Sequence, residues 1–150
     1  MLLYHFTCRH HIANIISRGV ITTTESNIHR TIEHYGPDVV WLTNEKLFNQ
    51  RCIDFVRKNL VPSEVYAKYN KHAIRVTVDI GDAQHWPAWS CSHKIKKRWF
   101  RALAKFGDPR SWYVVERCIT QDDWIIIEDV QKNEVLWKKF ENKSASKEID

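Results

Sequence analysis

The spacing of hydrophobic residues along this chain changes between a two-residue and a helical period, and these changes mark the predicted elements. Residues 2–7 read as a short strand, and residues 8–18 read as a helix with isoleucines on one face. Gly19 follows, at a position where helices commonly end in the left-handed conformation. Residues 20–24 are β-branched and predicted to be extended, whereas residues 25–36 are polar without a clear period and are predicted to form a loop beside the site.

A second strand-then-helix unit is predicted after the turn signal Pro37-Asp38. Residues 39–43 form the strand, and Asn44 is placed to cap a helix that runs to residue 55. Pro62 then restarts the chain into a polar stretch, and the alternation in residues 72–80 predicts another strand. The sequence Trp-Pro-Ala-Trp at residues 86–89 is interpreted as a loop.

The last third of the chain is predicted to contain one amphipathic helix and three strands. The helix spans residues 94–106, and its outward face is entirely basic: Lys94, Lys97, Arg98, Arg101 and Lys105. Strands are predicted over residues 111–117, 124–130 and 135–140, followed by a polar tail over residues 141–150. Helices and strands in this order predict a single α+β domain over residues 1–140.

Composition adds limits to this picture. A chain of 150 residues with 43% hydrophobic residues has the size and core of one domain. The net charge of +5 favours anionic partners such as nucleotides or nucleic acid. The four cysteines lie far apart without a paired motif, and no apolar run is long enough for a membrane segment, so a cytoplasmic protein with reduced thiols is expected.

The opening segment Tyr4-His5-Phe6-Thr7, followed by a helix and Gly19, resembles the N-terminus of the DNA-targeting ADP-ribosyltransferase toxins. The strand over residues 39–43 is similar to the strand of poly(ADP-ribose) polymerases that carries an aromatic residue against nicotinamide. This resemblance implies split antiparallel sheets flanked by helices, NAD as the substrate, and His5 and Trp41 as NAD-binding residues. The remaining members of the implied binding set are Thr7, Tyr35 and Thr43.

The resemblance also implies a catalytic glutamate near the start of a late strand. This glutamate would stabilise the transition state in which nicotinamide leaves. Trp112 stands at the expected position, and Glu116 lies four residues further along. Strand alternation puts Trp112, Val114 and Glu116 on one face, so Glu116 is the catalytic candidate, with Glu128 in reserve. If neither reaches the cleft, the domain binds a nucleotide without cleaving it.

Three functions therefore remain open. The first is an NAD-dependent ADP-ribosyltransferase-like protein that modifies nucleic acid or protein, which by analogy suits a phage or toxin–antitoxin setting. The second is an inactive nucleotide-binding or partner-inhibiting module of the same fold. The third is a nucleic-acid-binding protein that uses the basic helix beside Trp86 and Trp89, with His5 and Trp41 only part of the core.

A metal centre is not expected from this sequence. Cys8 and His10, and likewise Cys91 and His93, are two residues apart, which is not a usual spacing for zinc ligands. Glycine-rich phosphate loops and serine or cysteine nucleophile signatures are also absent from the sequence.

Overall fold

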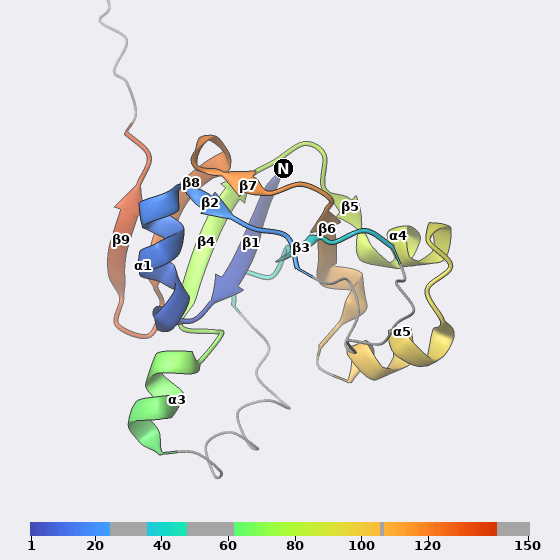
Figure 1. Ribbon diagram of the computed structural model, residues 1–150, viewed down its shortest axis with the longest axis horizontal. Coiled ribbons are helices and arrows are strands. Elements are labelled where there is room, and N and C mark those ends of the chain that lie inside the picture. Colours follow the sequence, from blue (N-terminus) through green and yellow to red (C-terminus); the bar gives the residue numbers. More distant parts are fainter. Residues whose placement is uncertain (25–35, 48–61, 106, 141–150) are drawn as a thin grey trace, which may run out of the picture.

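The computed structural model describes residues 1–24, 36–47, 62–105 and 107–140, which form one small α+β domain with antiparallel strand pairs (Figure 1). The helices of this part are α1 (Arg9–Arg18), α3 (Ser63–Tyr69), α4 (Trp86–Ser92) and α5 (Lys97–Ala104), with short 3-10 turns at Pro109–Ser111 and Gln121–Asp123. The strands are β1 (Leu2–Thr7), β2 (Val20–Ile21), β3 (Val40–Thr43), β4 (Ile74–Asp79), β5 (Gln84–His85), β6 (Trp112–Val115), β7 (Ile119–Thr120), β8 (Trp124–Asp129) and β9 (Glu134–Lys138). None of the four helices has the length and apolar character needed to cross a bilayer.

Seven strands form one sheet in the order β5-β6-β3-β1-β4-β8-β9, and β2 pairs with β7 in a separate two-stranded sheet. Along β1 and β4 the pairing is continuous, from Leu2 opposite Asp79 to Thr7 opposite Ile74. Between β1 and β3 the only paired position is Tyr4 opposite Thr43. The large sheet therefore opens between β1 and β3, and this opening positions the candidate site.

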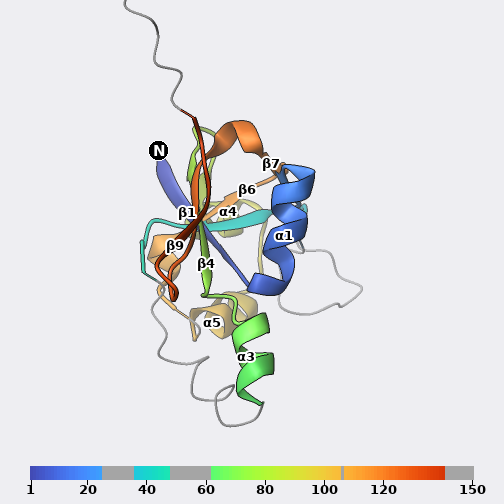
Figure 2. The same cartoon turned by 90° about the vertical axis from the view of Figure 1, so that its left-hand side faces the viewer.

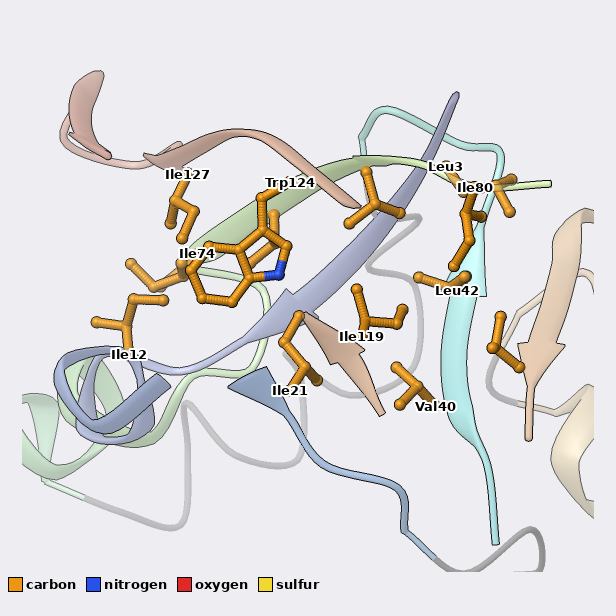
Figure 3. Close-up of a cluster of buried hydrophobic side chains, with 14 residues drawn as sticks. Leu3, Ile12, Ile21, Val40, Leu42, Ile74, Ile80, Ile119, Trp124 and Ile127 are labelled. Atoms are coloured by element: carbon orange, nitrogen blue, oxygen red, sulfur yellow. The ribbon is translucent and has the colours of Figure 1, made fainter. Parts of the chain in front are cut away.

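The main hydrophobic core lies between the large sheet and a layer made of α1 and the β2–β7 pair. Figure 2 shows α1 lying along one side of the strands. Trp124 of β8 is fully buried at the centre of this core, where Ile12 of α1, Ile21 of β2 and Ile119 of β7 converge on it (Figure 3). Burial of such large apolar side chains is the main force that holds α1 on the sheet.

A second, aromatic core lies on the opposite face of β3 and β6. Val40 and Leu42 point into the main core, so by strand alternation Trp41 points the other way. There it packs beside the buried Trp86 and Trp89 of α4, and α5 contributes Phe100 and Leu103. Helices α4 and α5 thus cover the β3–β6 end of the sheet, away from α1 and α3 (Figure 1).

The predicted first strand, first helix and glycine helix end are confirmed. β1 has the predicted bounds, and α1 begins one residue after its predicted start. Gly19 has a φ of 67°, and its N–H donates to the carbonyl oxygens of Ile15 and Ile16 at 2.9 and 3.3 Å. A residue with a side chain is strained in this left-handed conformation, which is why glycine ends the helix.

Several other predicted boundaries are wrong. Residues 86–89 begin a helix instead of forming a loop. Pro87 lies in the first turn, where the backbone N–H groups have no partner within the helix, so the N–H that proline lacks is not needed. The helix also lets both tryptophans be buried. The polar stretch after Pro62 is helix α3. None of its residues is buried, so its sequence carries no apolar stripe that would have predicted a helix. Residues 44–47 are not helical, and the rest of the helix predicted there lies outside the described residues.

The late elements are also shorter than predicted. The helix predicted over residues 94–106 is α5 at Lys97–Ala104, since Lys94 has a positive φ of 55° that interrupts helical geometry. The final strand is shifted to Glu134–Lys138.

Candidate functional site

A cavity of about 350 Å³ lies at the opening between β1 and β3. β1 supplies Tyr4, His5 and Phe6 to its wall, and β3 supplies Trp41, Leu42 and Thr43. The wall is completed by Lys71 before β4, Leu103 of α5 and Trp112 of β6. This volume falls within the usual range of about 300 to 1,000 Å³ for small-molecule sites.

His5 spans the opening between the two strands. Its Nδ1 lies 2.9 Å from the carbonyl oxygen of Trp41, at a point where the two backbones no longer pair. Burial lowers the pKa of His5, and the bond to the Trp41 carbonyl offsets this only in part. The imidazole is therefore neutral at pH 7; because a carbonyl oxygen can only accept, Nδ1 carries the proton and Nε2 is an acceptor.

Trp41 belongs both to the cavity wall and to the aromatic core. Its ring centroid is 4.6 Å from that of Trp86, and it meets Trp112 edge-on, with centroids 6.1 Å apart. Trp41 and Trp112 thus form two perpendicular indole walls on one side of the cavity. Packing against Trp86 fixes Trp41, so a planar ligand that contacts it would meet a rigid surface.

The polar groups of the cavity are few. Thr43 is buried, and its hydroxyl oxygen accepts a hydrogen bond from the Glu45 N–H at 3.1 Å. Lys71 is exposed and is the one cationic side chain in the described wall, which contains no carboxylate. A wall of aromatic rings with a neutral imidazole and one ammonium group favours a planar ligand that carries negative charge.

Glu116 directly follows β6 and points to the predicted face, but it does not line this cavity. Its Oε1 accepts a hydrogen bond from Trp89 Nε1 at 2.7 Å and lies 3.5 Å from His93 Nε2. Trp89 belongs to α4 and His93 directly follows that helix, at the end of the aromatic core beyond Val114. The side chain remains 40% exposed, so it is accessible to solvent while it is held by α4.

The other predicted binding and catalytic residues are dispersed. Thr7 is buried at the end of β1 and is not part of the cavity wall. Glu128 pairs with Arg75, with Oε2 and Nη2 2.8 Å apart, in a different part of the sheet. Tyr35 lies outside the described residues. Of the predicted set, the structure brings together His5, Trp41 and Thr43, together with Trp112.

The predicted basic side chains are exposed, but only Lys97, Arg98 and Arg101 lie on α5, and the tryptophan neighbours are buried. All five basic side chains are solvent-exposed, and none of them forms an ion pair within the part of the chain that the structure describes: Lys94, Lys97, Arg98, Arg101 and Lys105. Trp86 and Trp89 are 0% and 1% exposed, so they cannot stack on bases. Leu103, on the inner side of the same helix, contacts the cavity.

The sequence analysis missed several wall residues, Lys71 and Leu103 among them, and one thiol–imidazole pair. Lys71 and Leu103 reach the cavity only through packing of α5 and of the turn before β4. Cys8 lies beside His11, with Sγ and Nδ1 3.3 Å apart, a contact that the i, i+3 spacing at a helix start permits. Across residues 1–24, 36–47, 62–105 and 107–140, no group of three or more metal-binding side chains comes together.

No family model, curated protein or solved structure matches this chain, so its function is inferred from the residues of the cavity.

Proposed function

We propose that the protein binds NAD or a related adenine nucleotide in the cavity between β1 and β3, as an ADP-ribosyltransferase-like domain. The observation that carries the proposal is that His5, Trp41 and Thr43, which the resemblance implies for NAD binding, line one cavity of about 350 Å³. They do so because β1 and β3 are neighbours in the sheet and separate just beyond Tyr4.

The chemistry of the wall fits such a ligand. The indole rings of Trp41 and Trp112 line the cavity and offer apolar aromatic contact for a nicotinamide or adenine ring. The unprotonated Nε2 of His5 can accept a hydrogen bond from a ribose hydroxyl or a carboxamide. Lys71 supplies positive charge for a phosphate. Each of these roles is a binding role.

Turnover requires a carboxylate beside the ribose, where positive charge develops as nicotinamide leaves. Glu116 is held by Trp89 and is separated from the cavity by the aromatic core. This geometry favours the inactive nucleotide-binding module over the transferase. Transfer would require Glu116 to leave Trp89 and reach the ribose, so release of nicotinamide from NAD is the observation that separates the two functions.

A macromolecular partner is proposed for the exposed cations of α5, which are Lys97, Arg98 and Arg101. These cations would contact phosphates without reading sequence, and the resulting affinity would fall steeply with salt. Because Leu103 of the same helix contacts the cavity, a nucleic acid bound to these cations would lie near the nucleotide. The nucleic acid is therefore either the acceptor of a transfer or a target whose binding the nucleotide regulates.

Thermal unfolding tests the nucleotide proposal. A ligand that binds only the folded state stabilises it, by about 2.7 kcal/mol at roughly one hundred times its Kd. For a domain of this size we expect NAD at that excess to raise the Tm by roughly 5 to 10 °C. Lys71→Ala should keep the Tm of the free protein, because the side chain is exposed, and should reduce the shift given by NAD.

Lys138→Ala is the matched control for this experiment, since it removes an exposed lysine from β9 outside the cavity. It should leave the NAD shift unchanged. Equal shifts in both lysine variants would mean that NAD binds elsewhere. No shift in the original protein, combined with salt-sensitive nucleic-acid binding, would favour the purely nucleic-acid-binding function.

A further inference from the structure

A second cavity, of about 230 Å³, lies between α1 and α3 and contains a thiol beside an imidazole. Cys8 is the residue before α1 and is 2% exposed, and its Sγ is 3.3 Å from Nδ1 of His11 one turn later. Both side chains line the cavity, together with Val65 and Tyr66 of α3. The thiol is thus shielded from bulk solvent but faces a space large enough for a small molecule.

A buried amide in the same wall indicates the kind of molecule that fits. Asn70 is 3% exposed, and its Oδ1 accepts a hydrogen bond from the His72 N–H at 3.0 Å. Its Nδ2 is also buried and has no hydrogen-bond partner among the residues that the structure describes. A buried donor without a partner costs free energy, so a ligand oxygen that accepts from it is favoured in this cavity. Asn70 lines the cavity, and its free donor therefore points to a carbonyl-bearing ligand.

We propose that Cys8 is a nucleophilic modification site for compact electrophiles that carry a carbonyl group, such as α,β-unsaturated carbonyl compounds. The sulfur bonds to the β-carbon as the carbon–carbon π bond breaks. Nδ1 of His11 takes the thiol proton and returns it to the α-carbon, so no other reactant is consumed. The Asn70 amide donates to the carbonyl oxygen, on which negative charge develops.

This site is independent of the proposed nucleotide function. Lys71 is the one side chain found in the walls of both cavities, within the part of the chain that the structure describes. Cys8 and His11 make no contact with the cavity between β1 and β3. Modification of Cys8 can therefore be measured whether or not the protein binds NAD.

The test is alkylation of the native protein by acrylamide, followed by peptide mass spectrometry at each cysteine. Cys91 is exposed and serves as the internal reference. Although Cys8 is buried, we expect it to react faster than Cys91. We expect His11→Ala to lower the alkylation rate of Cys8 by at least about tenfold, which is at the low end for the loss of a general base. His10→Ala is the matched control, since it removes an adjacent exposed imidazole that is not bonded to Cys8.

A second variant keeps the proposal testable if His11→Ala disturbs the helix. Val65 is 43% exposed and lines the cavity, so Val65→Trp should fill the space without opening the core, and it should slow Cys8 but not Cys91. Reaction of Cys8 only at the rate of global unfolding would overturn the proposal. So would equal Cys8 rates in the original protein, His11→Ala and Val65→Trp.

Discussion

Replacement of Asp129 by alanine should lower the free energy of unfolding by about 3 to 5 kcal/mol, the usual cost of removing one partner from a buried ion pair. Asp129 ends β8 and is 3% exposed. Its carboxylate accepts two hydrogen bonds from the Arg9 guanidinium, at 2.6 and 2.9 Å, and further bonds from the N–H groups of Gln131 and Lys132. These contacts join the start of α1 to the turn between β8 and β9.

The same carboxylate gives this prediction a pH dependence. Burial alone would raise the pKa of Asp129, but Arg9 and the two backbone N–H groups outweigh it and hold the pKa below its ordinary value of 3.8. A group whose pKa is lower in the folded state stabilises the fold above its unfolded pKa, and this contribution is lost as the pH falls through the folded pKa. The difference between the original protein and Asp129→Ala should therefore be constant above about pH 5 and shrink below about pH 4.

Urea unfolding monitored by circular dichroism at several pH values from 3 to 8 measures this difference in the free energy of unfolding. Asp122→Ala is the control, because it removes an exposed aspartate in the turn before β8. It should change the free energy of unfolding by less than about 0.5 kcal/mol. An equal effect of the two substitutions would show that the Arg9–Asp129 contact does not hold α1 on the sheet.

Trp86→Ala should be destabilising to a similar degree, by about 3 to 5 kcal/mol. Trp86 is fully buried, and its ring lies 4.6 Å from Trp41, 5.4 Å from Trp89 and 6.5 Å from Phe100, measured between centroids. Its loss would leave a space at the centre of the aromatic core, between the sheet and both covering helices. Because Trp41 packs on Trp86, the variant should also lose nucleotide affinity.

Trp86→Phe separates packing from polarity. It keeps an aromatic ring in the core and removes a buried indole N–H that finds no hydrogen-bond partner within the described part of the chain. It should therefore be clearly less destabilising than Trp86→Ala when both are compared by urea unfolding. A loss below about 1 kcal/mol for Trp86→Ala would contradict the assignment of this residue to a close-packed core.

The sequence predicted the elements whose signals are local. β1 and the end of α1 at Gly19 follow from alternation and from the conformational freedom of glycine, and both are observed. α4 was missed because Pro87 is compatible with the first turn of a helix as well as with a loop. The prediction that Trp112, Val114 and Glu116 share one face was correct, since it depends only on alternation along β6 and into the residue that follows it.

The candidate site was only partly predictable, because some of its residues are placed by local signals and others by long-range packing. His5, Trp41 and Thr43 were grouped only because the resemblance implies NAD binding for all three, and they do line one cavity. Which end of the aromatic core Glu116 occupies is set by α4, whose Trp89 donates to it. Lys71 and Leu103 carry no local signal, because their places in the wall result from long-range packing.

The most direct test of the proposed binding site follows the indole N–H signals of ¹⁵N-labelled protein during titration with NAD. The seven tryptophans include cavity-wall residues and residues of the separate main core, so the protein contains its own control. We predict saturable shifts for Trp41 and Trp112 and none for Trp124, with each signal assigned by a Trp→Phe variant. Unchanged Trp41 and Trp112 signals at millimolar NAD would contradict the proposal that the cavity between β1 and β3 binds this nucleotide.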